Sequence, residues 1–203
     1  ATILATTNGR INWTIKNIKN KSHLKFNSIF FIDENKGWIV GDSGTIVTTV
    51  DGGANWSINR SILIQHQLKR IFFINSNTGW ISGQNGLLLK TTDGGKTWTP
   101  QSTNTVQTLN SIYFINETTG WVCGDGSTLL RTVNGGSSWE SLTVPAYANY
   151  YDIRFVSSNT GYLVGSKGLV AKTVNAGTNW QTITTNTINS FNSIEFINSA
   201  SGI

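Results

Sequence analysis

The sequence predicts an all-β fold, a β-propeller built from four-stranded blades. Three observations support this. A motif of eight residues that ends in tryptophan recurs along the chain, and its tryptophans are 43, 42, 41 and 41 residues apart. Each period contains four short runs of strand composition separated by turns rich in Gly, Asn and Asp,. No segment shows the 3.6-residue apolar period of a helix. A fixed period in the low forties indicates a repeat architecture with one supersecondary unit per period.

The recurring motif is Thr-x-Asp/Asn-x-Gly-x-x-Trp, with a degenerate copy over residues 6–13. Its shared positions in the four full copies are Thr49, Asp51, Gly53, Trp56; Thr91, Asp93, Gly95, Trp98; Thr132, Asn134, Gly136, Trp139; and Thr173, Asn175, Gly177, Trp180. We expect the Asp or Asn to accept hydrogen bonds from backbone amides two or three residues on. The glycine is expected to supply a positive φ, and the tryptophan to pack against the sheet. These predictions give the motif a structural role.

The repeat units follow in order along a single domain, residues 1–203. In the unit that starts at residue 68, strands are expected over residues 68–74, 80–82, 87–91 and 97–99. The first strand of each unit carries Ile and, two positions later, Phe, with apolar residues between them, so both of its faces are expected to be covered. The predicted units span residues 26–67, 68–108, 109–149 and 150–190. Half a blade falls in residues 1–25 and a partial blade in residues 191–203.

Composition limits the function classes. Only 12% of the residues are charged and the net charge is +5, so no dense basic stripe for nucleic acid is expected,. No apolar run approaches the ~18 residues of a membrane span. The two histidines, His23 and His66, do not align, and no Cys/His/Asp cluster has ligand spacing, so neither a metal nor another cofactor is expected. The single cysteine, Cys123, is expected to be a small buried residue.

The motif resembles the Asp-box, or bacterial neuraminidase (BNR) repeat. Together with the preceding Gly-Trp-x-x-Gly segments, which begin at Gly37, Gly79 and Gly120, it looks like the propellers of the photosystem II assembly and stability factor family. Bacterial secreted proteins with the same repeats are equally similar. The resemblance implies motif turns on the outer rim, away from the ligand face. Two blade counts stay open: a closed five-bladed ring in which residues 1–13 pair with residues 191–197, or part of a larger propeller, with seven blades by resemblance.

The face opposite the motif turns is the candidate binding face, because the blade-to-blade connections that lie there differ between repeats. The first two connections are basic and the fourth is rich in tyrosine, which suits an acidic peptide, a glycan or a lipid-anchored partner. The alternative is a solvated set of lysines that keeps the protein soluble. The candidate partner-binding residues are Lys19, Lys21, Lys25, Arg60, His66, Lys69, Arg70, Tyr147, Tyr150 and Tyr151.

Two further residues, Arg154 and Glu195, interrupt an otherwise aromatic column of the first strands. We expect them to form an ion pair between adjacent blades, so that Arg154→Ala destabilises the fold.

A hydrolase is the alternative function, since sialidases and xyloglucan-cleaving enzymes use similar repeats. The Arg-Ile-Pro signature of sialidases is absent, and no catalytic residue is assigned. The carboxylates available to a glycosidase are Asp42, Asp125 and Asp152, each interpreted as a turn residue. The favoured function is a non-catalytic binding or scaffold propeller for a protein or glycan, either an assembly factor or a secreted surface module. A secreted, cell-surface or periplasmic location is favoured, and thylakoid association follows from the family resemblance.

Overall fold

The computed structural model describes residues 2–6, 8, 11–16, 18, 24–60, 65–144, 146–198 and 201–202, and of residues 59 and 60 only the backbone. In this part of the chain every regular element is a strand. Four sheets have four antiparallel strands each, in the order β3-β4-β5-β6, β7-β8-β9-β10, β11-β12-β13-β14 and β15-β16-β17-β18, and β1 pairs with β2 alone. This confirms the all-β blade architecture.

Each full blade starts with a six-residue inner strand and ends with a shorter outer strand. The strands are β1 Ile3–Ala5, β2 Thr14–Lys16, β3 Phe26–Phe31, β4 Gly37–Gly41, β5 Thr45–Thr49, β6 Ser57–Arg60, β7 Leu68–Phe73, β8 Gly79–Gly83, β9 Leu88–Thr91, β10 Thr99–Pro100, β11 Leu109–Phe114, β12 Gly120–Gly124, β13 Leu129–Thr132, β14 Glu140–Ser141, β15 Tyr150–Phe155, β16 Gly161–Gly165, β17 Val170–Thr173 and β18 Gln181–Ile183.

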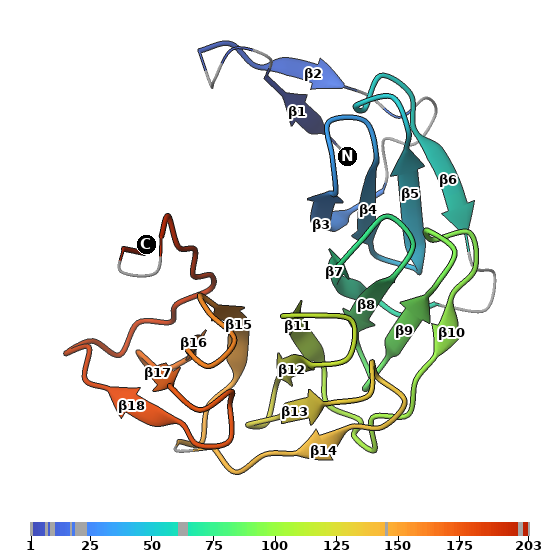
Figure 1. The fold of residues 1–203 in the computed structure, drawn as a ribbon. Helices are drawn as coiled ribbons and strands as arrows, with labels where there is room; N and C mark the ends of the chain where they lie inside the picture. The colour runs from blue at the N-terminus through green and yellow to red at the C-terminus, as the bar shows by residue number, and fades with distance from the viewer. Residues whose placement is uncertain are drawn as a thin grey trace.

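The sheets follow one another around an arc, with the first strand of each full blade on the inside, and the arc is open between the two ends of the chain (Figure 1). The predicted pairing of residues 1–13 with residues 191–197 is not present among the described residues, since β1 pairs with β2 and residues 191–198 form only the bridge Phe196–Gly202. Phe196 instead packs against Tyr162 of the last full blade, with ring centroids 4.6 Å apart. The closed five-bladed ring is therefore wrong for this structure.

The up-and-down strand order creates two faces. The box face carries the motif turns and the turns between the first and second strands of each blade. The connection face carries the blade-to-blade connections, of which residues 101–108, 142–144 with 146–149, and 184–190 are described, and the turns between the second and third strands. The motif turns and the blade-to-blade connections therefore lie at opposite ends of the strands.

The core lies between blades and not within them. Trp38 of β4 stacks on Phe73 of the next blade at 3.6 Å, and Phe73 in turn meets Trp98 of its own motif edge-on at 5.9 Å. The same sandwich recurs as Trp80–Phe114–Trp139 and Trp121–Phe155–Trp180. A buried tryptophan removes ~200 Å² from water, or roughly 5 kcal/mol at ~25 cal/mol per Å², so these stacks dominate blade cohesion.

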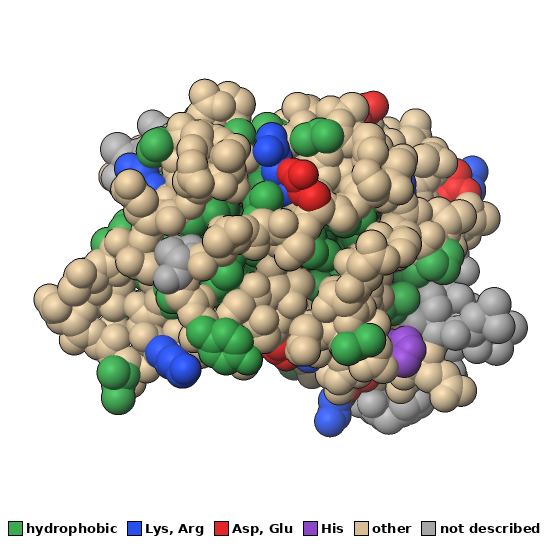
Figure 2. All heavy atoms as spheres, turned by 90° about the horizontal axis from the view of Figure 1, so that it is seen from below, with side chains coloured by type: hydrophobic (Ala, Val, Ile, Leu, Met, Phe, Trp, Pro, Cys, Tyr) green, Lys and Arg blue, Asp and Glu red, His purple; other side chains and the backbone are tan. Residues whose placement is uncertain are grey.

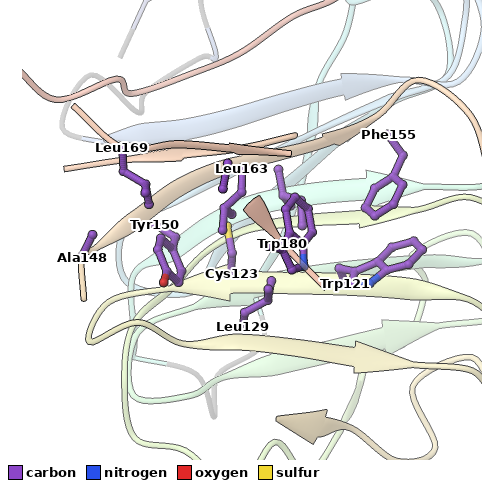
Figure 3. Close-up of a cluster of buried hydrophobic side chains, with 11 residues drawn as sticks. Trp121, Cys123, Leu129, Ala148, Tyr150, Phe155, Leu163, Leu169 and Trp180 are labelled. Carbon is purple, nitrogen blue, oxygen red and sulfur yellow. The ribbon is translucent and has the colours of Figure 1, made fainter. Parts of the chain in front are cut away.

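The cluster between the last two full blades shows the arrangement (Figure 3). Cys123 of β12 and Tyr150 of β15 are both fully buried there, beside Trp121 and Trp180. Burial raises the pKa of the Cys123 thiol well above its ordinary value, because the thiolate would lose its hydration,. Cys123 is thus a buried core residue, as the sequence predicts.

Candidate functional site

Each motif turn is fixed by two side chains. In the first copy the Thr49 hydroxyl accepts a hydrogen bond from the Gly53 amide at 2.9 Å, and the Asp51 carboxylate accepts one from the Asn55 amide at 2.8 Å. The other three copies repeat both bonds, with Asn replacing Asp in the last two. The Asp or Asn side chain therefore bonds chiefly the amide four residues on, because the threonine hydroxyl takes the amide two residues on. The amides three residues on, Ala54 and Lys96, make weaker contributions that also lower the pKa of Asp51 and Asp93.

The hydrogen bonds stabilise the charged form of both motif aspartates. Asp51 has a lowered pKa, chiefly through the backbone amide and side chain of Asn55,. The pKa of Asp93 is lowered further, chiefly through the hydroxyl and amide of Thr97. Both carboxylates accept hydrogen bonds from groups within their own turns.

The motif turns also join neighbouring blades. The amide of Gly94 bonds the carbonyl of Asn77 in its own blade, while the Gly94 carbonyl accepts the indole N–H of Trp38 from the preceding blade at 3.3 Å. Gly95 has a φ of 84° and lies against the same indole, so that a Cβ there would be 2.8 Å from the Trp38 nitrogen. The box face is thus occupied by contacts that hold the array together.

On the connection side, every inner strand contains a β-bulge, and the bulged residues form one row. They are Asn27, Lys69, Asn110 and Tyr151. A bulge re-aims the side chain of the extra residue, here toward the connection face. Asn27 donates to the Asp42 carboxylate at 2.9 Å and to the Leu68 carbonyl of the next blade at 2.8 Å. Asn110 makes the equivalent bonds to Asp125 and the Tyr150 carbonyl.

Lys69 and Tyr151 break this pattern. We call the concave inner side of the arc, lined by the first strands of the blades, the channel. The Lys69 ammonium donates to the Gln67 side chain at 3.0 Å, and both Lys69 and Tyr151 are half-buried near the start of their inner strands, at the connection-face mouth of the channel. Along the row, an asparagine that links two blades therefore alternates with a residue, Lys69 or Tyr151, that makes no such link to the described residues. Lys69 and Tyr151 are the two bulge residues that do not bond the described part of the next blade.

A polar network crosses the channel just inside this row. The Asp152 carboxylate, 2% exposed, accepts hydrogen bonds from the hydroxyls of Ser111 and Ser193 at 2.7 and 3.0 Å. Arg70 lies 3.6 Å from the same carboxylate with its side chain 28% exposed. Burial lowers the pKa of Arg70, since it disfavours the cation, and Asp152 opposes that shift,. Sequence reasoning placed Asp152 in a turn, which is wrong; it is a buried strand residue.

A second ion pair lies toward the box end of the channel. The Arg154 guanidinium is 3.3 Å from the Glu195 carboxylate and 5.7 Å from the ring centroid of Tyr113. This confirms the expected pair. The aromatic rings of Phe30, Phe72 and Tyr113, one from each preceding blade, continue the row and line a cavity of about 440 Å³ with it.

The predicted partner-binding residues divide into several groups. Lys25 is exposed, Tyr147 is 80% exposed, and His66 and Tyr151 are half-buried at the connection face. Arg70 points into the channel network. Tyr150 is 0% exposed and its hydroxyl donates to the Ala146 carbonyl at 2.6 Å, so its placement on the binding face is wrong. Lys19, Lys21 and the side chain of Arg60 lie outside the described residues.

The bulge explains the error at Tyr150. The register shift between Tyr150 and Asp152 turns Tyr151 outward and leaves the flanking residues facing the core,. A signal for the channel network was present in the sequence: the aligned column Ser28, Arg70, Ser111, Asp152 and Ser193 carries opposite charges two blades apart.

Among the described residues no group of three His, Cys, Asp or Glu side chains could hold a metal ion. No helix in the described chain is long and apolar enough to span a membrane. Figure 2 shows, on one side of the molecule, a few charged side chains scattered among hydrophobic side chains and a larger area of backbone and other side chains. No extended patch of one charge is seen among the described residues on this side.

Four-stranded blades stacked through Trp–Phe–Trp sandwiches and closed by recurring Thr-x-Asp/Asn-x-Gly-x-x-Trp turns define a β-propeller of the BNR type. The chain belongs to the family of the photosynthesis system II assembly factor YCF48, which matches residues 5–105 and 137–202. No curated protein matches the sequence.

Solved structures share the fold. A structure of YCF48 bound to a D1 peptide has a TM-score of 0.54 at 16% identity, covering 88% of this chain and 87% of that one. YCF48 from Cyanidioschyzon merolae has a TM-score of 0.67 at 19% identity, covering 86% of this chain and 60% of the other. An ancestral GH74 enzyme has a TM-score of 0.69 at 21% identity, and this chain spans 24% of it. At these identities the likeness shows the fold alone.

Proposed function

We propose that this propeller is a non-catalytic, protein-binding scaffold of the assembly-factor kind, which holds a peptide segment of its partner at the connection-face mouth of the channel. The observation that carries the proposal is the bulge row. Two of its four members, Asn27 and Asn110, tie adjacent blades together, and the other two, Lys69 and Tyr151, do not.

The chemistry of the mouth favours an acidic or aromatic peptide. Lys69 and the partly exposed Arg70 place two cations at the inner edge, and Tyr151 adds a ring with a polar tip,. A glycan remains the second ligand class, because tyrosine and asparagine side chains also suit sugars. The family supports the peptide, since a relative with the same fold was solved with a D1 peptide bound.

Substituting toward the repeat tests this proposal without disturbing the blades. Lys69→Asn and Tyr151→Asn place at each bulge the residue that Asn27 and Asn110 already carry. The probes are fluorescent acidic and aromatic peptides, matched neutral peptides, and a glycan array, measured with the full chain. We expect a preference for the acidic and aromatic peptides, and about tenfold weaker binding after both substitutions, about the loss of one good charged or aromatic contact.

Lys96→Ala is the matched control, since Lys96 is an exposed cation in a motif turn on the box face. It should leave peptide affinity unchanged. Equal affinity for acidic and neutral peptides, or an unaltered affinity in the double variant, would contradict the proposed site.

The likeness to a GH74 enzyme makes glycoside hydrolysis the second candidate. A glycosidase needs two carboxyl groups placed about the scissile bond. Asp42 and Asp125 each accept a hydrogen bond from a bulge asparagine, and Asp152 is buried with five polar partners, which supports the non-catalytic proposal. Release of reducing sugar from xyloglucan by the full chain, abolished by Asp125→Asn, would favour the hydrolase instead.

A further inference from the structure

Three connections between blades carry an exposed apolar side chain at the same place. Val106 and Tyr147 are each 80% exposed and Ile188 is 87% exposed. They are 41 residues apart, so they occupy equivalent positions in successive connections. The equivalent position in the preceding connection, Ile64, lies outside the described residues. We call Val106, Tyr147 and Ile188 the apolar tips.

The tips stand on connections held by internal hydrogen bonds. The Thr103 hydroxyl donates to the Gly86 carbonyl at 2.8 Å beneath Val106, and Thr185 donates to the Gly168 carbonyl at 2.7 Å beneath Ile188. Beneath Tyr147 the Tyr150 hydroxyl donates to the Ala146 carbonyl. These bonds hold the backbone one to three residues before each tip, and the tips themselves are exposed to the surroundings.

Two exposed lysines lie on the same face as the apolar tips. Lys25 and Lys167 are exposed on the same face, and the Lys167 ammonium lies 6.0 Å from the ring centroid of Tyr147. The two acidic residues in the turns of this face, Asp42 and Asp125, each accept an asparagine donor. A neutral amide leaves both carboxylates charged, but they are half-buried, whereas Lys25 and Lys167 are exposed. The exposed charge on the described part of this face is therefore positive.

The box face has a different charge balance. It also exposes apolar side chains, Val50, Val133 and Val174, at the second position of three motif copies. Acidic residues outnumber basic ones in the turns of that face, with Asp33, Glu34, Asp51, Asp93 and Glu117 against Lys36 and Lys96. An anionic surface would be repelled from these acids and attracted to the opposite side.

We propose that the connection face docks on an anionic lipid surface, with Val106, Tyr147 and Ile188 entering the headgroup region and Lys25 and Lys167 contacting lipid phosphates. A protein groove is matched by a continuous apolar patch, whereas single tips at equivalent positions of successive connections match an extended surface such as a membrane. Tyrosine favours the membrane–water interface and lysine adds attraction to acidic headgroups. This inference does not depend on the proposed peptide site, since it uses different residues and needs no protein partner.

Co-sedimentation of the full chain with vesicles tests it. The probes are vesicles of pure phosphatidylcholine and vesicles with about a third phosphatidylglycerol, at low and high salt. We expect binding to the anionic vesicles, weakened by salt because exposed charges are screened. The tip variant Val106→Ser/Tyr147→Ser/Ile188→Ser should bind at least tenfold more weakly, through loss of apolar insertion. Lys25→Glu/Lys167→Glu should lose binding to the anionic vesicles in particular.

The matched control is Val50→Ser/Val133→Ser/Val174→Ser, which removes the same number of exposed apolar groups from the box face and should bind like the unaltered protein. The proposal is overturned if the tip variant and the box variant bind equally, or if the unaltered protein fails to bind anionic vesicles. It is also overturned if the tip variant loses a peptide but no lipid, since the face would then be a protein interface. Unchanged melting temperatures of both variants exclude unfolding as the cause.

Discussion

Arg70 reaches across an entire blade to Asp152: its guanidinium on β7 lies 3.6 Å from the carboxylate on β15, with Ser111 of the intervening blade bonded to the same carboxylate. Three blades are thereby linked through one buried charge. Loss of this carboxylate would therefore weaken contacts among three blades, whereas loss of an ordinary interblade contact weakens only two.

Removing the carboxylate should be costly. Asp152→Ala leaves Arg70 and two seryl hydroxyls without their acceptor in a buried site, and we expect a loss of about 3 kcal/mol in the free energy of unfolding. Urea unfolding followed by tryptophan fluorescence measures it. Glu140→Ala is the control, because Glu140 is 61% exposed and 3.9 Å from Arg131; it should change stability by about 0.5 kcal/mol or less. Equal losses in the two variants would contradict the role given to Asp152.

Arg154→Ala should destabilise the fold by about 1–2 kcal/mol, mainly through lost packing over Tyr113. The ion pair itself adds less, since Glu195 is 66% exposed and solvent screens the charge. A double-mutant cycle with Glu195→Ala should therefore give a coupling energy of about 0.2–1 kcal/mol. A coupling energy above about 2 kcal/mol would show that the charge, and not the ring contact, dominates.

Acid should loosen the motif turns unequally. Asp51 and Asp93 have pKa values below those of the unfolded chain, so they contribute stability above about pH 4, where the unfolded carboxyl is ionised, and lose it as pH falls through the folded pKa,. The Asn134 and Asn175 copies cannot titrate. Asp51→Asn/Asp93→Asn should thus flatten the decline of melting temperature between pH 4 and pH 2, and parallel curves for the variant and the unaltered protein would contradict this.

The backbone of the last motif copy offers a stabilising substitution. Ala176 has a φ of 56°, where the other copies have Gly52, Gly94 and Gly135 at 66–74°. This region disfavours side chains, so Ala176→Gly should stabilise the protein by about 0.5 kcal/mol after the entropy gained by the unfolded chain is subtracted. The reverse change, Gly135→Ala, should destabilise it, because its Cβ would lie 2.8 Å from the Glu117 carbonyl. Thermal melts of both variants should shift in opposite directions.

The fold was predictable because the repeat makes every local signal recur. The Ile and Phe of the first strands align from repeat to repeat, and so do the motif tryptophans. An ambiguous segment in one repeat can therefore be assigned from the equivalent segments of the other three. The Arg154–Glu195 pair was predictable for the same reason, since two charges in an aromatic column on adjacent blades have one obvious partner.

The binding face was harder to predict, because a β-bulge changes by one residue which side chains of a strand face the core, and the amino-acid composition gives no sign of the bulge. Tyr150 and Tyr151 are chemically identical, yet one is buried and the other lies at the rim. Asp152 resembled a turn residue because its partners, Arg70 and Ser193, lie in other repeats and become neighbours only when the blades curve around a common axis.

Trp38 stacks on Phe73 of the next blade, and this contact recurs along the array. The repeated sequence unit is therefore one blade, whereas the unit that is stabilised as a whole is the contact between two blades. Sequence duplication copies a blade, but each hydrophobic cluster is made of halves from two blades, so a blade cut out along its sequence boundaries takes half of two cores with it. Substitutions in the connections between blades therefore disturb few packing contacts. A substitution of a stacked Trp or Phe ring changes the packing of two adjacent blades at the same time.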